Sequence, residues 1–390
     1  MTSRQETASS GCSGADVAGA CRTGVIAHFK TIFLQRSETF IRLQIDSMPG
    51  YRHLAVCRSF HPDLVSGGIE HFVPPALDFA AGRMIRRMPA TSGELGRRGV
   101  RLVHAHFGKE GWLATPFSGR HRKLPLVVSF YGRDASAVMD IPVWRSRYAH
   151  LFAEADRILV LSPHMAGLLE AAGGPGERIR VHSFGIDLAR FPFVRRDPPS
   201  GGPARLLFVG RLVPKKGLHT ALRALARLDR CELVVVGDGP GRTAALDLAT
   251  ELGIAGRVSF RGWLPREGVA DLMAGCLALL VPSETGRDGD MEGTPTVIFE
   301  AMASGLPVIG TEHAGIPWQL DSGRCGSLVP EGDHEALAHA VEGLLSPGGN
   351  RASVAEAARA RVEACFDASV QGAELERIYE ELILSRNGSR

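Results

Sequence analysis

The 390-residue chain contains no apolar run long enough to span a bilayer. Its first 22 residues are rich in Ser, Ala and Gly and lack the apolar core of a signal peptide, so we expect a disordered tail over residues 1–22. The seven cysteines are scattered and show no Cys-x-x-Cys spacing, which favours reduced thiols over a metal site. The net charge of +3 is too small for a dedicated nucleic-acid binder. These absences favour a cytoplasmic protein that has no nucleic acid as a partner.

Hydrophobic residues make up 44% of the chain, which supports a globular fold, and 390 residues exceed one ordinary core. Short apolar runs alternate with amphipathic stretches, as in a parallel sheet covered by helices. The strongest break is Asp197-Pro-Pro-Ser-Gly-Gly-Pro203, which we interpret as a linker. We expect an α/β protein of two Rossmann-like, doubly wound domains, over residues 23–196 and 205–367, joined by a linker at 197–204. In such sheets ligands bind beyond the carboxyl ends of the strands, which places the site in the cleft between the domains.

The expected strands are short apolar runs spread over both domains. They span residues 24–28, 53–58, 102–106, 126–130 and 158–161 in the first domain, and 206–209, 232–236, 258–260, 278–281 and 307–310 in the second. Helical patterns lie between them, for example over residues 218–228 and 333–345.

The most informative stretch carries two glutamates on either side of a predicted helix start. Thr294 is a good N-cap, and Pro295 suits the first helical position because its missing N–H costs nothing there. Gly305 fits the left-handed position just past the helix end. Glu292 is then expected in the loop before the helix and Glu300 within the helix.

The start of this helix predicts an anion site. Glu300 follows Thr296 by four residues and Val297 by three, so the three residues share a face. The N–H groups of Thr296 and Val297 lack intrahelical partners and lie at the positive end of the helix dipole, although Thr294 is positioned to cap one of them. A phosphate flanked by sugar hydroxyls is the ligand that suits this helix end and the two carboxylates together.

Three segments follow expected strand ends in the second domain. Gly210-Arg211 and Lys216 place cations at a strand-to-helix turn, where they either clamp a diphosphate or form a solvated basic turn. The glycine-rich turn around Gly239 either admits a ligand closely or is only a tight turn. Around Trp263, either the backbone groups contact the edge of a nucleotide base, or the Trp263 ring is partly buried and serves packing alone.

Three further segments lie at strand ends of the first domain. Alternation points His104 and His106 to the same side, but no third metal ligand at a suitable spacing is evident. A core or supporting role is therefore the favoured interpretation for His104. The next strand end brings a phenol, a guanidinium and a carboxylate to the cleft, from Tyr131, Arg133 and Asp134. The segment Ser37-Glu38-Thr39 opens a helix, where capping is the simplest role and a ligand role for Glu38 is the alternative.

In this order and at these distances, the motifs resemble those of the retaining glycosyltransferases of the GT-B fold, family 4, and most of all the branch with exopolysaccharide and colanic-acid-type transferases. The resemblance covers roughly residues 24–385. The motifs that carry it are Ser37-Glu-Thr-Phe-Ile41, His104-Ala-His-Phe-Gly108, Gly210-Arg-Leu with Lys216-Gly217, and Asp288-Gly-Asp-Met-Glu-Gly-Thr-Pro295 through Glu300.

The resemblance implies that Glu300 holds the nucleotide ribose hydroxyls and that Glu292 contacts the donor sugar. It also implies that Arg211 and Lys216 neutralise the diphosphate, which with Glu292 makes the predicted catalytic set. The resemblance and the strand-end segments together give the predicted donor-binding positions, which are Gly210, Gly239, Trp263, Gly293, Thr294, Thr296, Val297 and Glu300. The predicted acceptor-side residues are Glu38, His106, Tyr131, Arg133 and Asp134. A C-terminal helix over residues 368–390 is expected to cross back onto the first domain.

The chain departs from its relatives at three places. Many relatives have histidine where this chain has Tyr131, which is able to donate a hydrogen bond but is a poor proton acceptor near neutral pH. Trp318 stands where relatives often have glutamate. The first loop, residues 29–37, contains no glycine, which fits the exopolysaccharide branch.

The expected chemistry breaks the bond between the anomeric carbon of a sugar and a diphosphate. Cations and the helix start are aimed at the negative charge that forms on the leaving group. We assign Asp288-Gly-Asp290 a structural or sugar-facing role in preference to a metal site, and expect no metal and no cofactor, with a UDP-linked sugar as donor substrate. The resemblance implies retention of configuration. Because no nucleophile is evident, we expect a front-face route in which a donor phosphate oxygen takes the proton of the acceptor.

The first domain is locally basic, which indicates either contact with an anionic membrane at its cytoplasmic face or ordinary solvated helix faces. The residues concerned are Arg83, Arg86, Arg87, Arg97, Arg98, Arg101, Arg120, Arg122 and Lys123. The sequence does not determine the oligomeric state.

Two acceptors suit a transferase of a hexose or N-acetylhexosamine: a lipid-linked saccharide in polysaccharide assembly, or a small natural-product core such as an aminocyclitol in antibiotic biosynthesis. Two other classes stay open from the sequence. One is a sugar-nucleotide epimerase of similar fold, and the other is a non-catalytic nucleotide-sugar binder, for which Tyr131 is the main support.

Overall fold

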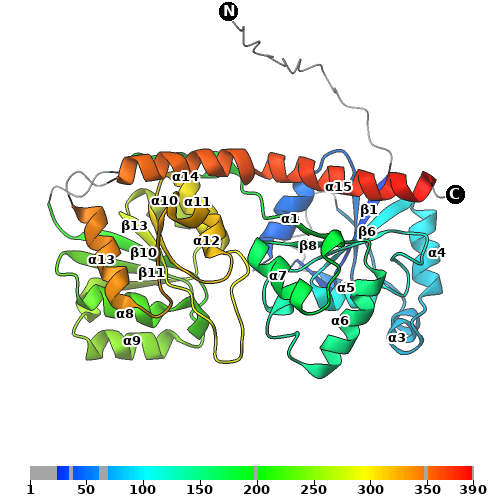
Figure 1. Cartoon of the computed structure of the whole chain (residues 1–390), viewed down its shortest axis with the longest axis horizontal. Helices are drawn as coiled ribbons and strands as arrows, with labels where there is room; N and C mark the ends of the chain where they lie inside the picture. The colour runs from blue at the N-terminus through cyan, green and yellow to red at the C-terminus, as the bar shows by residue number, and fades with distance from the viewer. Residues whose placement is uncertain (1–23, 35–37, 61–68, 197–200, 347–349, 389–390) are drawn as a thin grey trace, which may run out of the picture.

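The computed structural model describes residues 24–34, 38–60, 69–196, 201–346 and 350–388. Two α/β domains lie side by side, and the helices α14 (Arg351–Cys365) and α15 (Ala368–Gly388) run in succession along one edge of both (Figure 1). The predicted tail at 1–22 and the first half of the predicted linker, residues 197–200, lie outside the described residues.

The first domain is built on a parallel sheet of seven strands in the order β5-β3-β1-β6-β7-β8-β9, counted over the described residues. These strands are β1 (Val25–Phe29), β3 (Arg52–Val56), β5 (Glu70–Phe72), β6 (Val100–His106), β7 (Leu126–Ser129), β8 (Arg157–Val160) and β9 (Ile179–Val181). The helices that cover it are α1 (Thr39–Asp46), α3 (Ala76–Ile85), α4 (Pro89–Arg97), α5 (Gly108–Ala114), α6 (Pro142–Glu154) and α7 (Pro163–Ala171). A small parallel pair, β2 (Ile32–Phe33) and β4 (Ser59–Phe60), stands apart from this sheet.

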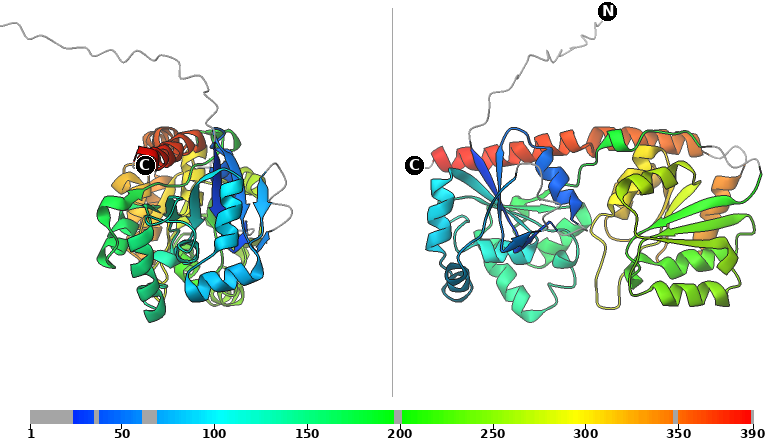
Figure 2. Two further views of the ribbon diagram at one scale, coloured as in Figure 1. Left: turned by 90° about the vertical axis from the view of Figure 1, so that its right-hand side faces the viewer. Right: turned by 180° about the vertical axis from the view of Figure 1, so that it is seen from behind.

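The second domain has a parallel sheet in the order β12-β11-β10-β13-β14-β15. Its strands are β10 (Ala204–Val209), β11 (Cys231–Val236), β12 (Val258–Gly262), β13 (Ala278–Val281), β14 (Val308–Thr311) and β15 (Ser327–Val329). Its helices are α8 (Leu218–Ala226), α9 (Arg242–Glu251), α10 (Arg266–Ala274), α11 (Thr296–Ser304), α12 (Ile316–Gln319) and α13 (His334–Leu345). Helices lie on both sides of each sheet, which confirms the doubly wound α/β fold (Figures 1 and 2).

The central strands form where apolar, often β-branched residues follow one another, since both faces of a parallel sheet are buried. In β13 all four residues are buried, and β1 is buried over its whole length. All ten expected strands are present, with ends shifted by a few residues. The strands β5, β9 and β15, and the two-residue pair β2 and β4, were not predicted, because strands of two or three residues carry no continuous apolar run.

The C-terminal helix α15 packs on the first domain, whereas α14 packs on the second. Leu375, Ile378 and Leu382 of α15 join a buried cluster with Ile26 and Leu102 of the first sheet. The burial of this face fixes α15 against the domain that the chain left at the end of β9.

The chain crosses between the domains twice, and the two crossings are bonded to each other. Ile186 N donates to Phe366 O at 2.8 Å, and Ala368 N donates to Ile186 O at 2.9 Å. A side chain at Gly185 would come within 2.5 Å of Ala368, so only glycine permits this close pairing. Ile186 already packs in the core of the second domain, so the chain changes domain before the linker that was predicted at 197–204.

Candidate functional site

A cleft of about 650 Å³ lies between the domains, at the carboxyl ends of both sheets. It brings together most of the residues predicted from the sequence. Those that line it are Glu38, Tyr131, Arg133, Asp134, Gly210, Arg211, Lys216, Trp263, Glu292, Gly293, Thr294, Thr296, Val297 and Glu300. Gly239 and His106 do not line it. A larger hollow of about 860 Å³ at the far end of the first domain contains none of the residues predicted for catalysis, donor binding or the acceptor side. The cleft is therefore the candidate site because of the residues that line it, although it is the smaller of the two hollows.

The helix start in the cleft differs from the prediction by one residue. Helix α11 begins at Thr296 and Pro295 is its cap residue, so the predicted N-cap at Thr294 was wrong. The Thr294 hydroxyl instead donates to the carbonyl of Leu161 in the first domain, at 3.3 Å. No side chain caps α11 among the described residues, and Thr296 and Val297, whose N–H groups begin its first turn, line the cleft. At the other end, Gly305 has a φ of 74°, which confirms the predicted left-handed position.

Glu292 is the most constrained carboxylate of the cleft. Only 8% of its surface is exposed, and its Oε2 lies 2.9 Å from Lys216 Nζ. Burial acts to raise the pKa of Glu292, but the Lys216 and Lys215 ammonium groups outweigh it and hold the pKa below its usual value. Its Oε1 is buried and accepts no hydrogen bond from the described residues, with Lys215 Nζ still 4.0 Å away. Glu292 therefore stays ionised and keeps one oxygen available to a ligand hydroxyl.

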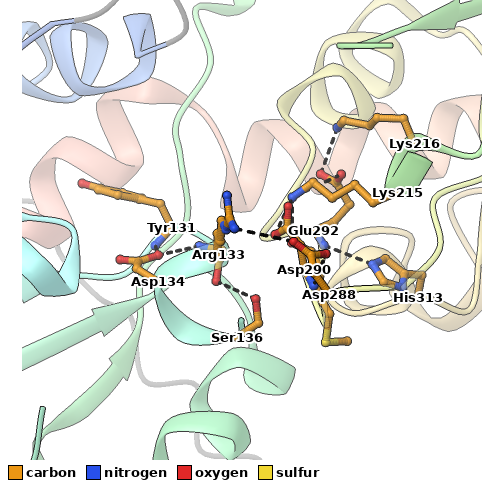
Figure 3. A network of polar contacts seen from close by, with 12 residues as sticks. Tyr131, Arg133, Asp134, Ser136, Lys215, Lys216, Asp288, Asp290, Glu292 and His313 are labelled. Carbon is orange, nitrogen blue, oxygen red and sulfur yellow. Dashed lines mark hydrogen bonds and ion pairs between the residues drawn. The ribbon is translucent and has the colours of Figure 1, made fainter. Parts of the chain in front are cut away.

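Lys215 was not singled out from the sequence, yet it is the more deeply buried of the two lysines. Its Nζ donates to Asp290 Oδ1 and to the Met291 carbonyl, both at 3.0 Å (Figure 3). These contacts give Asp290 a structural partner and fold the loop before α11 onto the turn after β10. Because Asp290 and Met291 precede Glu292 in this loop, their bonds to Lys215 also fix the position of Glu292.

His313 of the second domain also holds this loop and was missed from the sequence. Its Nε2 accepts the backbone N–H of Glu292 at 3.1 Å, so its Nδ1 carries the hydrogen and donates to Glu331 Oε1 at 2.7 Å (Figure 3). The backbone of Glu292 is thereby fixed by a neutral imidazole whose tautomer is set by Glu331.

Glu300 faces the cleft from α11, with 6% of its surface exposed. Burial raises its pKa, and the guanidinium of Arg266, 3.8 Å away at the start of α10, opposes that rise. Arg266 lines the cleft and was missed, since nothing in the sequence places it beside Glu300.

The glycine turns of the second domain divide between two roles. Gly237 lines the cleft, and a Cβ on it would lie 1.9 Å from the Gly210 carbonyl. Gly239, which was predicted to bind the donor, instead packs on the preceding turn, where its Cβ would lie 2.7 Å from the Leu212 carbonyl. Gly239 is therefore a structural turn residue outside the cleft. Trp263 lines the cleft with 69% of its surface exposed, which does not fit the packing interpretation.

The two domains touch at the rim of the cleft. Arg133 Nη2 lies 3.5 Å from Asp288 Oδ2, and both side chains are largely exposed (Figure 3). A Cβ on Gly293 would lie 2.2 Å from the Tyr131 carbonyl, so only glycine permits the backbones to approach this closely.

Asp134 and Glu38 support the first-domain wall. The Asp134 carboxylate accepts the backbone N–H groups of Tyr131 and Gly132 at 3.0 Å and that of Gly108 at 2.9 Å. Burial nevertheless raises the pKa of Asp134. Glu38 Oε1 pairs with Lys30 Nζ at 3.0 Å, and its side chain does not cap α1. The predicted cap Ser37 lies outside the described residues.

Tyr131 does not present its hydroxyl to the donor loop. Its hydroxyl lies 2.7 Å from His106 Nδ1, and it points away from Glu292 (Figure 3). The ring packs among Phe40, Phe107 and Phe184, with ring centres 5.0, 4.8 and 5.5 Å away. Burial raises the pKa of Tyr131 well above its usual value, so the phenol stays neutral.

The direction of the hydrogen bonds behind Tyr131 is fixed at a carbonyl. Met48 O only accepts, so His53 Nε2 donates to it at 3.0 Å. Then His53 Nδ1 accepts from His28 Nε2, and His28 Nδ1 accepts from His106 Nε2, each at 3.0 Å. His106 Nδ1 therefore accepts the hydrogen of the Tyr131 hydroxyl. The Tyr131 hydroxyl thus donates its hydrogen bond within the first domain and not to a ligand in the cleft. Burial together with Lys30 lowers the pKa of His106 to about 3, consistent with neutral rings.

The sequence showed no third ligand at a suitable spacing from His104 and His106, but the fold supplies one. His28 of β1 joins them, with one nitrogen of each ring within 4.8 Å of the others. The ring nitrogens are nevertheless engaged: His104 meets the hydroxyls of Tyr379 and Ser129 at 2.6 and 2.7 Å. This supports the core interpretation, in which the cluster links β1 and β6 to α15.

Two protein-family descriptions match the chain. "Glycosyl transferases group 1" matches residues 192–361, and "Glycosyltransferase Family 4" matches residues 49–190. The boundary between the matches falls where the chain has just entered the second domain.

Several curated proteins are similar in sequence. The putative colanic acid biosynthesis glycosyltransferase WcaL of Escherichia coli is 33% identical over 71% of this chain and 70% of its own length. The amylovoran biosynthesis glycosyltransferase AmsK of Erwinia amylovora is 34% identical over 71% of this chain and 69% of its own length. WcaL of Salmonella typhimurium is 35% identical over 60% of this chain, and that match spans 59% of the length of the Salmonella protein.

Solved structures share the architecture at low sequence identity. Anabaena HepE in complex with UDP superposes with a TM-score of 0.75, 19% identity, and coverage of 92% of this chain and 100% of that one. The sucrose-phosphate synthase of Thermosynechococcus elongatus has a TM-score of 0.74, 20% identity, and coverage of 93% and 100%. At these identities the likeness concerns the fold.

Proposed function

Because the chain belongs to family 4 of the glycosyltransferases, we propose that it moves a hexose or N-acetylhexosamine from a UDP-linked donor to a hydroxyl of a saccharide acceptor in polysaccharide assembly. The polysaccharide setting follows the names of the similar WcaL and AmsK proteins. HepE, of the same fold, has been solved with UDP, which supports a UDP-linked donor.

One observation carries the proposal. The buried Oε1 of Glu292 lacks a hydrogen-bond donor beside an uncapped helix start and a lysine. A sugar hydroxyl satisfies the oxygen, and a phosphate satisfies the first-turn N–H groups of α11. Glu300 lies on the same helix, where its carboxylate is placed to accept ribose hydroxyls. A nucleotide sugar supplies all three groups in one molecule.

The catalytic step we propose is front-face transfer with retention and without metal. Lys216 and Arg211, with the start of α11, stabilise the charge that forms on the diphosphate as the anomeric bond breaks. A donor phosphate oxygen takes the proton of the acceptor hydroxyl. Glu292 is ion-paired to Lys216, which holds both groups beside the reacting carbon.

The proposal is tested with a panel of nucleotide sugars incubated with the full chain in a chelator-containing buffer. We expect slow UDP release from one UDP-sugar, faster when a saccharide acceptor is added, and an α-linked product from an α-linked donor. Conversion of the donor into another sugar nucleotide, or binding without any UDP release, would contradict a transferase. A trapped glycosyl-enzyme adduct would contradict the front-face route.

We also propose that the first domain contacts an anionic membrane on its cytoplasmic side. The structure narrows the basic set: Arg97 and Arg98 both pair with Glu94, and Arg86 packs on the Trp112 ring at 4.2 Å. Arg83 and Arg87 remain exposed at the end of α3. Between them stand Met84 and Ile85, which are 82% and 65% exposed, and Leu77 on the same helix is 87% exposed. Exposed apolar side chains flanked by arginines suit a lipid headgroup region.

Vesicle co-sedimentation tests this contact at physiological salt. We expect binding to vesicles with phosphatidylglycerol and not to phosphatidylcholine alone, and a loss of several-fold in Met84→Ser. Leu246→Ser on α9, 42% exposed in the second domain, is the matched control. Equal sedimentation of Met84→Ser and the unaltered chain would remove α3 from the contact. Among the described residues, no helix is both long and apolar enough to cross a membrane.

A further inference from the structure

A second pocket, of about 370 Å³, opens on the first domain next to the cleft and has no role in the reaction described above. It is formed by the loop after β1 together with α3, α5 and α6. The residues that line it are Lys30, Thr31, Ile32, Arg83, Lys109, Glu110, Trp112, Leu113, Trp144 and Arg147. Basic and aromatic side chains therefore meet in one hollow.

Three cations of this pocket have no carboxylate partner. Arg83, Lys109 and Arg147 form no ion pair or side-chain hydrogen bond within the part of the chain that the structure describes. Instead, the Arg147 guanidinium lies 4.5 Å from the Trp112 ring centre and 4.7 Å from that of Trp144. Lys109 Nζ lies 4.9 Å from the Trp144 ring centre. The rings orient the cations without neutralising them, and stacking leaves the N–H edge of a guanidinium available to an anion.

The acidic groups near the pocket are already used. Glu110 Oε2 accepts the Thr31 hydroxyl at 2.7 Å and the Thr31 N–H at 3.1 Å, and burial raises the pKa of Glu110. Lys30 and Glu38 pair with each other at 3.0 Å. The three remaining cations thus face one lining carboxylate, so the pocket has an excess of positive charge that an anion would balance.

The pocket and the cleft share a wall. Lys30 lines the pocket, whereas its partner Glu38 lines the cleft. Phe107, which also lines the cleft, lies under Lys30 with its ring centre 5.3 Å from Nζ. Its φ of 79° is strained for a residue that is not glycine, which indicates that the ring is held in place by its surroundings. The Lys30–Glu38 pair therefore connects the lining of the pocket to the first-domain wall of the cleft.

We propose that this pocket binds the phosphate or diphosphate of the acceptor, an assignment that rests on the transfer function proposed above. Arg83 and Arg147 suit phosphate oxygens through paired N–H groups, and Lys109 acts as a point charge. The acceptor is then a phosphorylated saccharide, carried either by a lipid or free in solution. The exposed Met84 and Leu77 on α3, the helix that supplies Arg83, favour the lipid-linked form. The second domain would then bind the diphosphate of the donor and the first domain the phosphate or diphosphate of the acceptor.

The test uses the full chain saturated with UDP, so that the donor site is occupied. Farnesyl diphosphate and inorganic diphosphate are titrated in separate arms, and binding is followed by calorimetry and by tryptophan fluorescence. We expect both to bind, with Arg147→Gln and Lys109→Gln each weakening affinity by about tenfold, as fits the loss of one charge-assisted contact. Arg145→Gln is the control: it removes the same charge from an exposed residue of α6, outside the pocket. Thermal unfolding of each variant identifies any that is misfolded, and the two pocket variants test the same claim independently.

The outcomes separate the sources of the phosphate. Tighter binding of farnesyl diphosphate assigns a lipid-linked acceptor, and equal binding of the two probes assigns a soluble phosphorylated one. No binding of either probe to the UDP-saturated chain, or an equal loss in Arg145→Gln, overturns the proposal. Failure of the transfer function shows separately, as absence of UDP release from any UDP-sugar, and leaves the binding titration readable.

Discussion

The two walls of the cleft differ in how their polar groups are satisfied. On the second-domain wall, Glu292, Lys216 and Glu300 keep charge and bonding capacity directed at the cleft. On the first-domain wall, the Tyr131 hydroxyl and the Asp134 carboxylate are turned inward to partners of their own domain. The difference indicates that the second domain stabilises charge, whereas on the first-domain wall Tyr131 offers a neutral aromatic face and Arg133 carries an exposed charge at the rim.

Removal of charge from the second-domain wall is expected to have the largest effect on turnover. We expect Lys216→Ala to lower turnover by about a hundredfold, comparable to the loss of one donor to a developing anion. The variant also leaves Glu292 without its 2.9 Å partner. UDP release under saturating donor measures the effect, with Lys123→Ala, an exposed lysine of the first domain, as control. Unchanged turnover in folded Lys216→Ala would remove the lysine from the clamp.

A smaller effect is expected at the nucleotide end of the same wall. Glu300→Ala should weaken UDP binding by about tenfold, because each hydrogen bond to a carboxylate contributes more than one to a neutral group. Turnover at saturating donor should change less than the affinity. Calorimetric titration with UDP gives the dissociation constant. A variant with normal UDP affinity and low turnover would move Glu300 from binding to chemistry.

The two glutamates should also separate by pH. Burial raises the pKa of Glu300, whereas the net shift of Glu292 is downward, because two lysines outweigh its burial. As pH falls from 7 to 5, Glu300 therefore takes up a proton first and loses its capacity as an acceptor of ribose hydroxyls. We expect UDP affinity to fall by a few-fold over this range. The UDP affinity of Glu300→Gln should change with pH only through the titration of the UDP phosphate itself. An identical pH dependence of UDP affinity in the unaltered chain and in Glu300→Gln would rule out Glu300 as its source.

The smallest effect is expected on the opposite wall. Tyr131→Phe removes a hydroxyl that serves His106, so turnover should stay within about threefold, while the free energy of unfolding falls by about 1 kcal/mol. Denaturant unfolding and UDP release measure the two quantities. A drop in turnover as large as that of Lys216→Ala would show that the first-domain wall takes part in the chemistry.

The second-domain wall was the more predictable from sequence because its groups lie in two short segments. Glu292, Glu300 and Gly305 lie just before, within and just after one predicted helix. Lys216 lies in the short connection that follows the end of a predicted strand. The misplaced cap at Thr294 has a tertiary cause, since its hydroxyl is drawn to Leu161 of the other domain.

The residues that were missed depend on contacts between distant segments. His313 reaches Glu292 from 21 positions away and Lys215 reaches Asp290 from 75, so no local spacing connects them. The direction of the Tyr131 hydroxyl depends on a chain of histidines that ends at Met48. A carboxylate such as Asp134 looks the same in the sequence whether it faces a substrate or its own backbone.

The paired crossings at Ile186 and Ala368 give the molecule a pivot. Two strands of chain that are hydrogen-bonded to each other resist pulling apart, but they bend and twist together. We therefore expect the domains to rotate relative to each other about this pair of segments, which lies on the edge that carries α14 and α15 (Figure 1). Such a rotation would release the donor loop from the first domain at Arg133 and Thr294 without disturbing either sheet, so substrate entry and product exit would cost only the few contacts at the rim.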